Sequence, residues 1–203
     1  MLLEDSKITF RTVTIGDTCV GKTCIINRFL RSTFDQDQTN TIGSLFETYT
    51  TDRGAHNIEL HLWDTAGQEQ YRSLGSVYFR SAAAALIVYD ITNKQSFLNC
   101  EQWLKSFRDA SGEQSLVFLV GNKSDLDSQR DVTREEAQLW ADKNGCAAFW
   151  ETSAKTGDNV VELFEKIVDE LYKSYVLDSP AVMNNLHPGR PEPRADQGSQ
   201  CGC

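Results

Sequence analysis

The sequence has no excess of basic residues and no long hydrophobic run. Its 20 Lys and Arg residues stand against 29 Asp and Glu residues, which gives a formal net charge of −9 at pH 7. This balance excludes a non-specific nucleic-acid binder, because such a protein needs excess cations to neutralise phosphates. No segment approaches the ~18 apolar residues of a membrane-spanning helix, and Glu4 and Asp5 interrupt the region where a secretory signal would be apolar. We therefore expect a protein made and folded in the cytosol.

The cysteines lack the spacing of a metal site or a disulfide framework. Four of the six are scattered along the chain: Cys19, Cys24, Cys100 and Cys146. In a reducing compartment such residues are usually small core or loop side chains. The other two, Cys201 and Cys203, form a Cys-Gly-Cys ending that has no packing role to explain it.

Segments of strand composition alternate with segments of helical periodicity. Strands are expected at residues 7–15, 47–51, 58–63, 84–89, 116–120 and 147–150. Helices are expected at residues 22–30, 96–110, 133–143 and from residue 159 onward. This order predicts a doubly wound α/β fold, in which helices cover both faces of a mostly parallel sheet. A turn at residues 52–54 joins two of the strands and predicts one antiparallel edge strand.

The chain is expected to divide into a folded domain, residues 1–176, and a flexible tail, residues 177–203. Helical periodicity stops near Leu177, and prolines then recur among polar residues. A segment of that composition buries too little apolar surface to offset the entropy lost on ordering.

A phosphate-binding loop follows the first strand. The pattern G-x-x-x-x-G-K-[ST] is matched by Gly16, Asp17, Thr18, Cys19, Val20, Gly21, Lys22 and Thr23. The glycines let successive backbone N–H groups and the next helix N-terminus face an anion. Lys22 would supply charge at the outer phosphates and Thr23 a hydroxyl to Mg²⁺.

Further polar residues follow three later strands. Asp64 comes after the strand at residues 58–63, Asn-Lys-Ser-Asp at residues 122–125 comes after the strand at residues 116–120, and Ser-Ala-Lys at residues 153–155 comes after the strand at residues 147–150. The carboxyl ends of parallel strands share one sheet edge, so Asp64 should lie near the phosphates and assist Mg²⁺, through water.

A guanine site is predicted at the same edge. The carboxylate of Asp125 can accept hydrogen bonds from N1–H and the 2-amino group of guanine, whereas adenine would leave it unpaired. The residues assigned to this pocket are Asn122, Lys123, Asp125, Ser153, Ala154 and Lys155.

With these motifs in this order, the chain resembles the small GTPases of the Ras superfamily over about residues 7–175. The resemblance implies that Phe34 stacks on guanine, that Thr41 closes onto Mg²⁺ and that the Ala154 N–H contacts the guanine carbonyl. It also implies that the Gly67 N–H senses the γ-phosphate and that Gln68 orients the attacking water.

Smaller matches resemble the Rab family in particular. Tyr-Arg-Ser-Leu at residues 71–74 is Rab-like, and Phe46, Trp63 and Tyr78 occupy the positions of the family's exposed aromatic triad, unless they are ordinary core residues. The chain departs from the family at residues 44–45, where Ser-Leu replaces the usual Val-Asp. That change affects the expected effector contacts and not nucleotide binding.

The resemblance implies a switch in membrane trafficking with several partners. The order of two loops, residues 35–43 and 66–76, would depend on the γ-phosphate and Mg²⁺. No arginine finger is evident in cis, so turnover should be slow and need an activating protein worth ~10³–10⁵ in rate. An exchange factor, a GDP-dissociation inhibitor or escort protein and effectors are also implied. Geranylgeranyl groups on Cys201 and Cys203 would hold the protein on the cytoplasmic face of an intracellular membrane.

Three alternatives remain at this point. A metabolic kinase using ATP would need an adenine-tolerant pocket, against which the run at residues 122–125 argues. A module that holds GTP without hydrolysing it is disfavoured by Gln68. A Ras-superfamily switch outside the Rabs would differ in its C-terminal processing.

Overall fold

The computed structural model describes residues 7–38, 41, 44–65 and 78–178, with only the backbone of residues 45 and 178. Contacts divide the chain into two units, residues 1–172 and 173–203, and the fold below is that of the first. The predicted tail is nearly all outside the described residues, although Leu177 and Asp178 are still helical.

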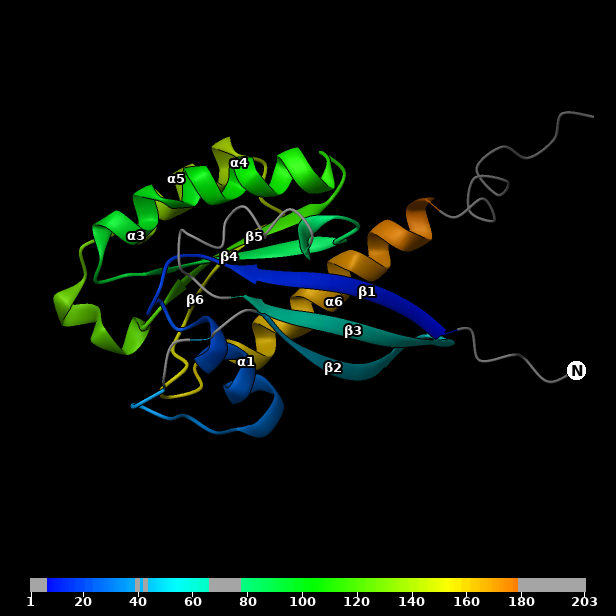
Figure 1. Cartoon of the computed structure of the whole chain (residues 1–203), viewed down its shortest axis with the longest axis horizontal. Coiled ribbons are helices and arrows are strands. Elements are labelled where there is room, and N and C mark those ends of the chain that lie inside the picture. The colour runs from blue at the N-terminus through cyan, green and yellow to red at the C-terminus, as the bar shows by residue number, and fades with distance from the viewer. Residues whose placement is uncertain (1–6, 39–40, 42–43, 66–77, 179–203) are drawn as a thin grey trace, which may run out of the picture. The chain divides into compact units, whose positions relative to one another are not determined.

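A six-stranded sheet forms the centre of this unit, in the order β2-β3-β1-β4-β5-β6 (Figure 1). The strands are β1 (Lys7–Ile15), β2 (Ser44–Arg53), β3 (His56–Thr65), β4 (Ala84–Asp90), β5 (Leu116–Asn122) and β6 (Ala148–Thr152). Neighbours run parallel except β2 and β3, so β2 is the antiparallel edge strand. The predicted doubly wound architecture is therefore confirmed.

Helices cover both faces of the sheet (Figure 1). They are α1 (Lys22–Arg31), α3 (Lys94–Leu98), α4 (Cys100–Ser111), α5 (Arg134–Lys143) and α6 (Val160–Asp178), with the 3₁₀ helix η2 (Ser124–Gln129). Alternate residues of a strand face opposite sides. In β4, Leu86 and Val88 belong to the core with α1 and α6, whereas Ala85 and Ile87 belong to the core with α3, α4 and α5.

Two predicted elements differ from the structure. The helix expected at residues 96–110 is divided at Asn99, and α3 begins earlier because the Asn93 side chain accepts hydrogen bonds from the N–H groups of Gln95 and Ser96. The hairpin turns at Gly54, with φ of 60°, and the adjoining Ala55, so β2 continues through Arg53. The pairing of β2 with β3 extends to residues 53 and 56, beyond the strands expected at residues 47–51 and 58–63.

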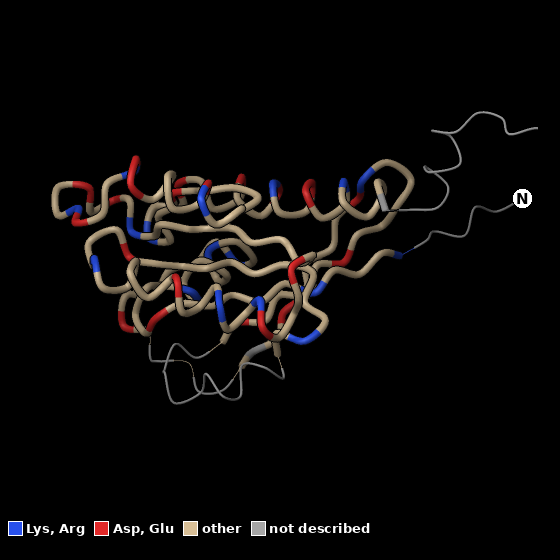
Figure 2. Tube along the Cα trace, turned by 90° about the horizontal axis from the view of Figure 1, so that it is seen from above, with Lys and Arg blue, Asp and Glu red and all other residues tan. Residues whose placement is uncertain are grey.

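The charge is distributed over the surface. Both Lys or Arg and Asp or Glu occur along α4, α5 and α6, and Figure 2 shows the two signs interspersed on the Cα trace. Among the described residues, no helix combines the length and the apolar composition that a bilayer span requires.

Candidate functional site

A cavity of about 450 Å³ lies where the loops that follow β1, β5 and β6 meet. Most of the predicted site residues line it: Thr18, Cys19, Gly21, Lys22, Thr23, Phe34, Thr41, Asn122, Lys123, Asp125, Ala154 and Lys155. A second hollow, of about 1010 Å³, is larger, but exposed charged side chains such as Asp127 and Glu135 line it. The chemistry-bearing residues thus gather in the smaller cavity.

The backbone of the phosphate loop depends on two glycines. Gly16 has φ of 141°, and a Cβ there would lie 2.2 Å from the Val88 carbonyl oxygen. Gly21 has φ of 96°, and its Cβ would lie 2.2 Å from Nδ2 of Asn122. Any side chain would combine an unfavourable dihedral with a collision, so both positions require glycine.

Lys22 is held inside the loop, where its Nζ donates to the carbonyl oxygens of Gly16 at 2.9 Å and Asp17 at 2.7 Å. Burial lowers the pKa of Lys22 to about 8, although the carboxylates of Asp64 and Asp17 act in the opposite direction. A bound anion would offset part of that burial penalty, which suits this ammonium to a phosphate ligand.

Three oxygen-bearing side chains meet beside the loop. Oδ2 of Asp64 accepts hydrogen bonds from Oγ1 of Thr23 at 2.6 Å and of Thr41 at 3.4 Å, and the two hydroxyl oxygens are 2.7 Å apart. Asp64 is 2% exposed, and burial raises its pKa, opposed by the Thr23 hydrogen bond and the charge of Lys22. Its Oδ1 is buried without a partner among the described residues.

This cluster fits Mg²⁺, a hard cation that binds one or two carboxylates together with hydroxyls, waters and substrate phosphates. The unpartnered Oδ1 of Asp64 is available to a water of the ion's shell. Within the described ranges, no group of three or more His, Cys, Asp or Glu side chains could hold a metal alone. In such sites, waters and substrate phosphate oxygens complete the coordination of Mg²⁺.

Asn122 joins the phosphate loop to the loop after β6. Its Nδ2 donates to the Val20 carbonyl at 2.8 Å, and its Oδ1 accepts from the Ala154 N–H at 3.2 Å and from Oγ1 of Thr152 at 3.4 Å. Asn122 is 1% exposed. A buried amide that uses both ends fixes the relative position of these segments.

The predicted base pocket has its own hydrogen bonds. Oδ1 of Asp125 accepts from Oγ of Ser153 at 2.6 Å, which orients the carboxylate at the cavity wall. Lys123 adopts φ of 68°, and its Nζ pairs with Oδ2 of Asp90 at 2.7 Å. Ser153 therefore supports Asp125 from behind, although it does not itself line the cavity.

Sequence reasoning missed the side-chain roles of two residues. Asp17 was assigned to the phosphates, but its carboxylate accepts hydrogen bonds from Nδ2 of Asn99 at 2.6 Å and Nε1 of Trp103 at 2.8 Å. Arg28, outside every motif, binds backbone carbonyls of the loop after β6. One signal of this role for Asp17 was visible in the sequence, because it is an acidic residue inside a loop that should bind phosphates.

The aromatic triad is contiguous. The ring centroid of Trp63 lies 5.4 Å from that of Phe46 and 5.6 Å from that of Tyr78. Phe46 is 48% exposed, whereas Trp63 and Tyr78 pack partly against the core under α3, α4 and α5. Core packing alone therefore does not account for Phe46.

Several predicted residues lie outside the described part of the chain. These are Gly67, Gln68, Cys201 and Cys203, together with the Tyr-Arg-Ser-Leu run at residues 71–74.

Comparison with known proteins gives a consistent result. The model of the Ras family matches residues 11–173. Ras-related protein YPTC6 of Chlamydomonas reinhardtii is 42% identical over 190 residues, which cover 92% of this chain and 88% of the relative. Ras-related protein RABA2c of Arabidopsis thaliana is 41% identical over 186 residues, covering 89% and 85%. Ras-related protein Rab-25 of Homo sapiens is 43% identical over 169 residues, covering 83% and 79%.

Proposed function

We propose that this chain, which belongs to the Ras family, is a GTP-hydrolysing switch of the Rab type that acts in membrane trafficking. The observation that carries this function is the single cavity that joins the phosphate loop, the hydroxyl–carboxylate cluster and Asp125. Switching requires that these three groups recognise one nucleotide and that the γ-phosphate alters the adjoining loops.

Hydrolysis would use charge neutralisation around the outer phosphates. Thr23 and Thr41 would hold Mg²⁺, with Asp64 acting through water, and the bound ion supplies positive charge there. Lys22 and the loop N–H groups would stabilise the charge that develops as water attacks the γ-phosphorus and the bond to the bridging oxygen breaks. We assign to Gln68 the orientation of that water and to the Gly67 N–H the contact with the γ-phosphate.

Guanine specificity would come from the opposite end of the cavity. Asp125 would accept from N1–H and the 2-amino group, and Phe34 would stack on the ring. The backbone N–H of Lys155, and that of Ala154 shared with Oδ1 of Asn122, would donate to the 6-oxo group. Adenine offers no donor at N1 or position 2, so it would leave the Asp125 carboxylate without a partner on the base.

We further propose that other proteins set the pace of the cycle. Slow intrinsic turnover would depend on an activating protein and slow GDP release on an exchange factor. Effectors would contact the loops at residues 35–43 and 66–76 as well as the aromatic triad. A GDP-dissociation inhibitor or escort protein would accompany the lipid-bearing form.

The tail, residues 177–203, would anchor the protein through two geranylgeranyl groups, on Cys201 and Cys203. One chain of myristoyl size gives only marginal binding, about 10⁴ M⁻¹, and stable anchoring takes a second lipid or a basic patch. From Asp178 onward the only Lys or Arg residues are Arg190 and Arg194, so a second lipid is needed.

The experiment that tests hydrolysis is single-turnover phosphate release from the loaded protein. Gln68→Leu should keep GTP affinity and lose phosphate release, with or without an activating protein. Gln138→Leu is the matched control, because Gln138 is exposed on α5 and bonds only Asp142 among the described contacts. A Gln68→Leu variant that releases phosphate at the wild-type rate would remove Gln68 from the mechanism.

A further inference from the structure

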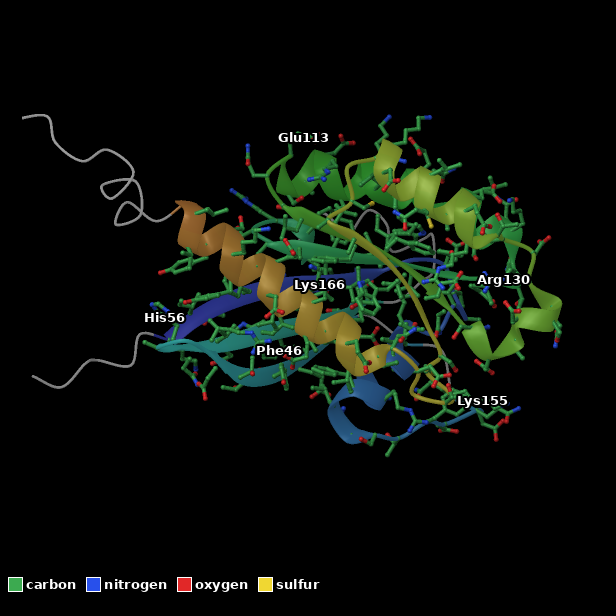
Figure 3. All side chains as sticks on the ribbon, turned by 180° about the vertical axis from the view of Figure 1, so that it is seen from behind. Phe46, His56, Glu113, Arg130, Lys155 and Lys166 are labelled. Carbon is green, nitrogen blue, oxygen red and sulfur yellow. The ribbon has the colours of Figure 1, made fainter. Side chains whose placement is uncertain are left out.

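Arg28 lies on α1 and uses its guanidinium as a three-way fork. Its Nε donates to the Ala154 carbonyl at 2.8 Å, one terminal nitrogen donates to the Lys155 carbonyl at 2.7 Å, and the other donates to the Ser32 carbonyl at 2.8 Å. Lys155 appears in Figure 3 on the loop that follows β6. Arg28 and Ala154 are 126 residues apart, so this contact joins two distant segments.

The fork fixes two consecutive peptide planes of that loop. The carbonyl of Ala154 lies in the same planar, trans peptide as the N–H of Lys155, so pinning the oxygen also orients the N–H on the opposite side. The next peptide is fixed through the Lys155 carbonyl. Both residues line the cavity, and Ala154 is 3% exposed.

The third contact reaches the other wall of the base pocket. Ser32 ends α1 in the left-handed region, with φ of 54°, and its N–H donates to the Arg28 carbonyl at 3.0 Å. Phe34, two residues later, lines the cavity. The same side chain therefore connects the loop at residues 153–157 with the segment that carries the aromatic ring.

We infer that Arg28 is a positioning residue for guanine recognition, acting by orienting the backbone N–H of Lys155 toward the 6-oxo group of the base. This inference rests on the proposed guanine site. The planar guanidinium presents several donors at fixed angles, which a lysine ammonium does not reproduce. Arg28→Lys should therefore keep the positive charge but lose most of the orienting effect on the loop after β6.

The test compares three diphosphates by titration against the nucleotide-free full chain. GDP and IDP carry the 6-oxo group, whereas the diphosphate of 2-aminopurine riboside lacks it. Arg28→Ala should weaken GDP and IDP by the same factor, roughly 10-fold for the loss of charge-assisted hydrogen bonds. The 2-aminopurine nucleotide should change less than about 2-fold, because it lacks the acceptor that the oriented Lys155 N–H serves.

Two further variants keep the test decisive. Arg31→Ala, on the same helix, removes an exposed guanidinium that bonds Asn27 and Glu47, and it should leave all three affinities unchanged. Arg28→Lys serves if Arg28→Ala lowers the melting temperature too far, and it should show the same selective loss.

Equal weakening of all three nucleotides by Arg28→Ala and Arg28→Lys would overturn the inference, because it would mean general loosening of the loop. A wild-type chain that binds ADP as well as GDP would instead overturn the proposed function, and the inference with it.

Discussion

The two halves of the cavity are built in different ways. The phosphate half comes mainly from one continuous run, residues 16–23, whose shape depends on glycine backbone and on one internal lysine. The base half is assembled from three separate segments, and the side chains of Asn122, Ser153 and Arg28 help to join them. A contiguous motif can be recognised in a sequence, whereas an assembled pocket depends on long-range contacts.

The two halves meet where Asn122 contacts the phosphate loop, so the largest expected effect comes from Gly21→Ala. The new Cβ would lie 2.2 Å from Nδ2 of Asn122 and would require φ near 96°. Backbone strain and lost buried hydrogen bonds should together weaken GDP binding roughly 100-fold or more. Fluorescence titration of the refolded variant measures this loss.

Gly145→Ala is the matched control for Gly21→Ala. Gly145 also has positive φ, 63°, but a Cβ there has no atom within 4 Å. It should cost about 1 kcal/mol of unfolding free energy and leave GDP affinity unchanged. Wild-type affinity in Gly21→Ala would show that the two halves are not joined at this point.

Much of the fold was predictable, because periodicity reports which side of an element is buried. The strands and the order of motifs after them placed Lys22 and Asp125 at one sheet edge without any structure. The break at Asn99 was not predictable, since residues 94–111 carry helical composition throughout. That break brings Asn99 to Asp17, a contact across 82 residues of sequence.

The side-chain supports of the site were equally hidden. From the sequence alone, Arg28 is an ordinary cation in the last turn of a helix and Trp103 is an ordinary core aromatic residue. Each acquires its role from a partner far along the chain, at 126 and 86 residues. Local pattern does not specify such pairs, because only tertiary folding brings the partners within hydrogen-bonding distance.

A second prediction concerns the phosphate half, whose affinity for GDP should depend on pH through Lys22. In the free protein burial holds the pKa of Lys22 at about 8, and phosphates would raise it again by favouring the ammonium. Binding should therefore take up a proton at higher pH, and GDP affinity should fall as pH rises above about 8, by up to about 10-fold per unit.

Calorimetry in buffers of different ionisation enthalpy measures the proton taken up. Uptake should be small at neutral pH and should grow as pH passes the pKa of Lys22. Without nucleotide, the effect of pH on folding has the opposite sign. Lys22 in the unfolded chain has its ordinary pKa of 10.5 and binds more protons than in the folded chain, so the free energy of unfolding should rise with pH between about 8 and 10.5. Proton-independent GDP binding at high pH would contradict this account.

The smallest expected effect is on the outer support of the phosphate half. Trp103→Phe removes the hydrogen bond from Nε1 to Asp17 and keeps most of the buried ring. GDP release should become roughly 3- to 10-fold faster, less than the full loss of one charge-assisted hydrogen bond, because Asp17 keeps the hydrogen bond from Asn99. Trp140→Phe, a half-buried tryptophan on α5, should leave the release rate unchanged.

The most direct test of the central claim, that this cavity selects guanine through Asp125, is calorimetric titration of Asp125→Asn with GTP and with xanthosine triphosphate. The new amide can donate to the 2-oxo group of xanthine but no longer accepts from both guanine donors. Asp127→Asn is the control, since Asp127 is exposed and pairs with Arg130. The account predicts that only Asp125→Asn reverses the preference, in favour of xanthosine triphosphate. An Asp125→Asn variant that still prefers GTP would contradict it.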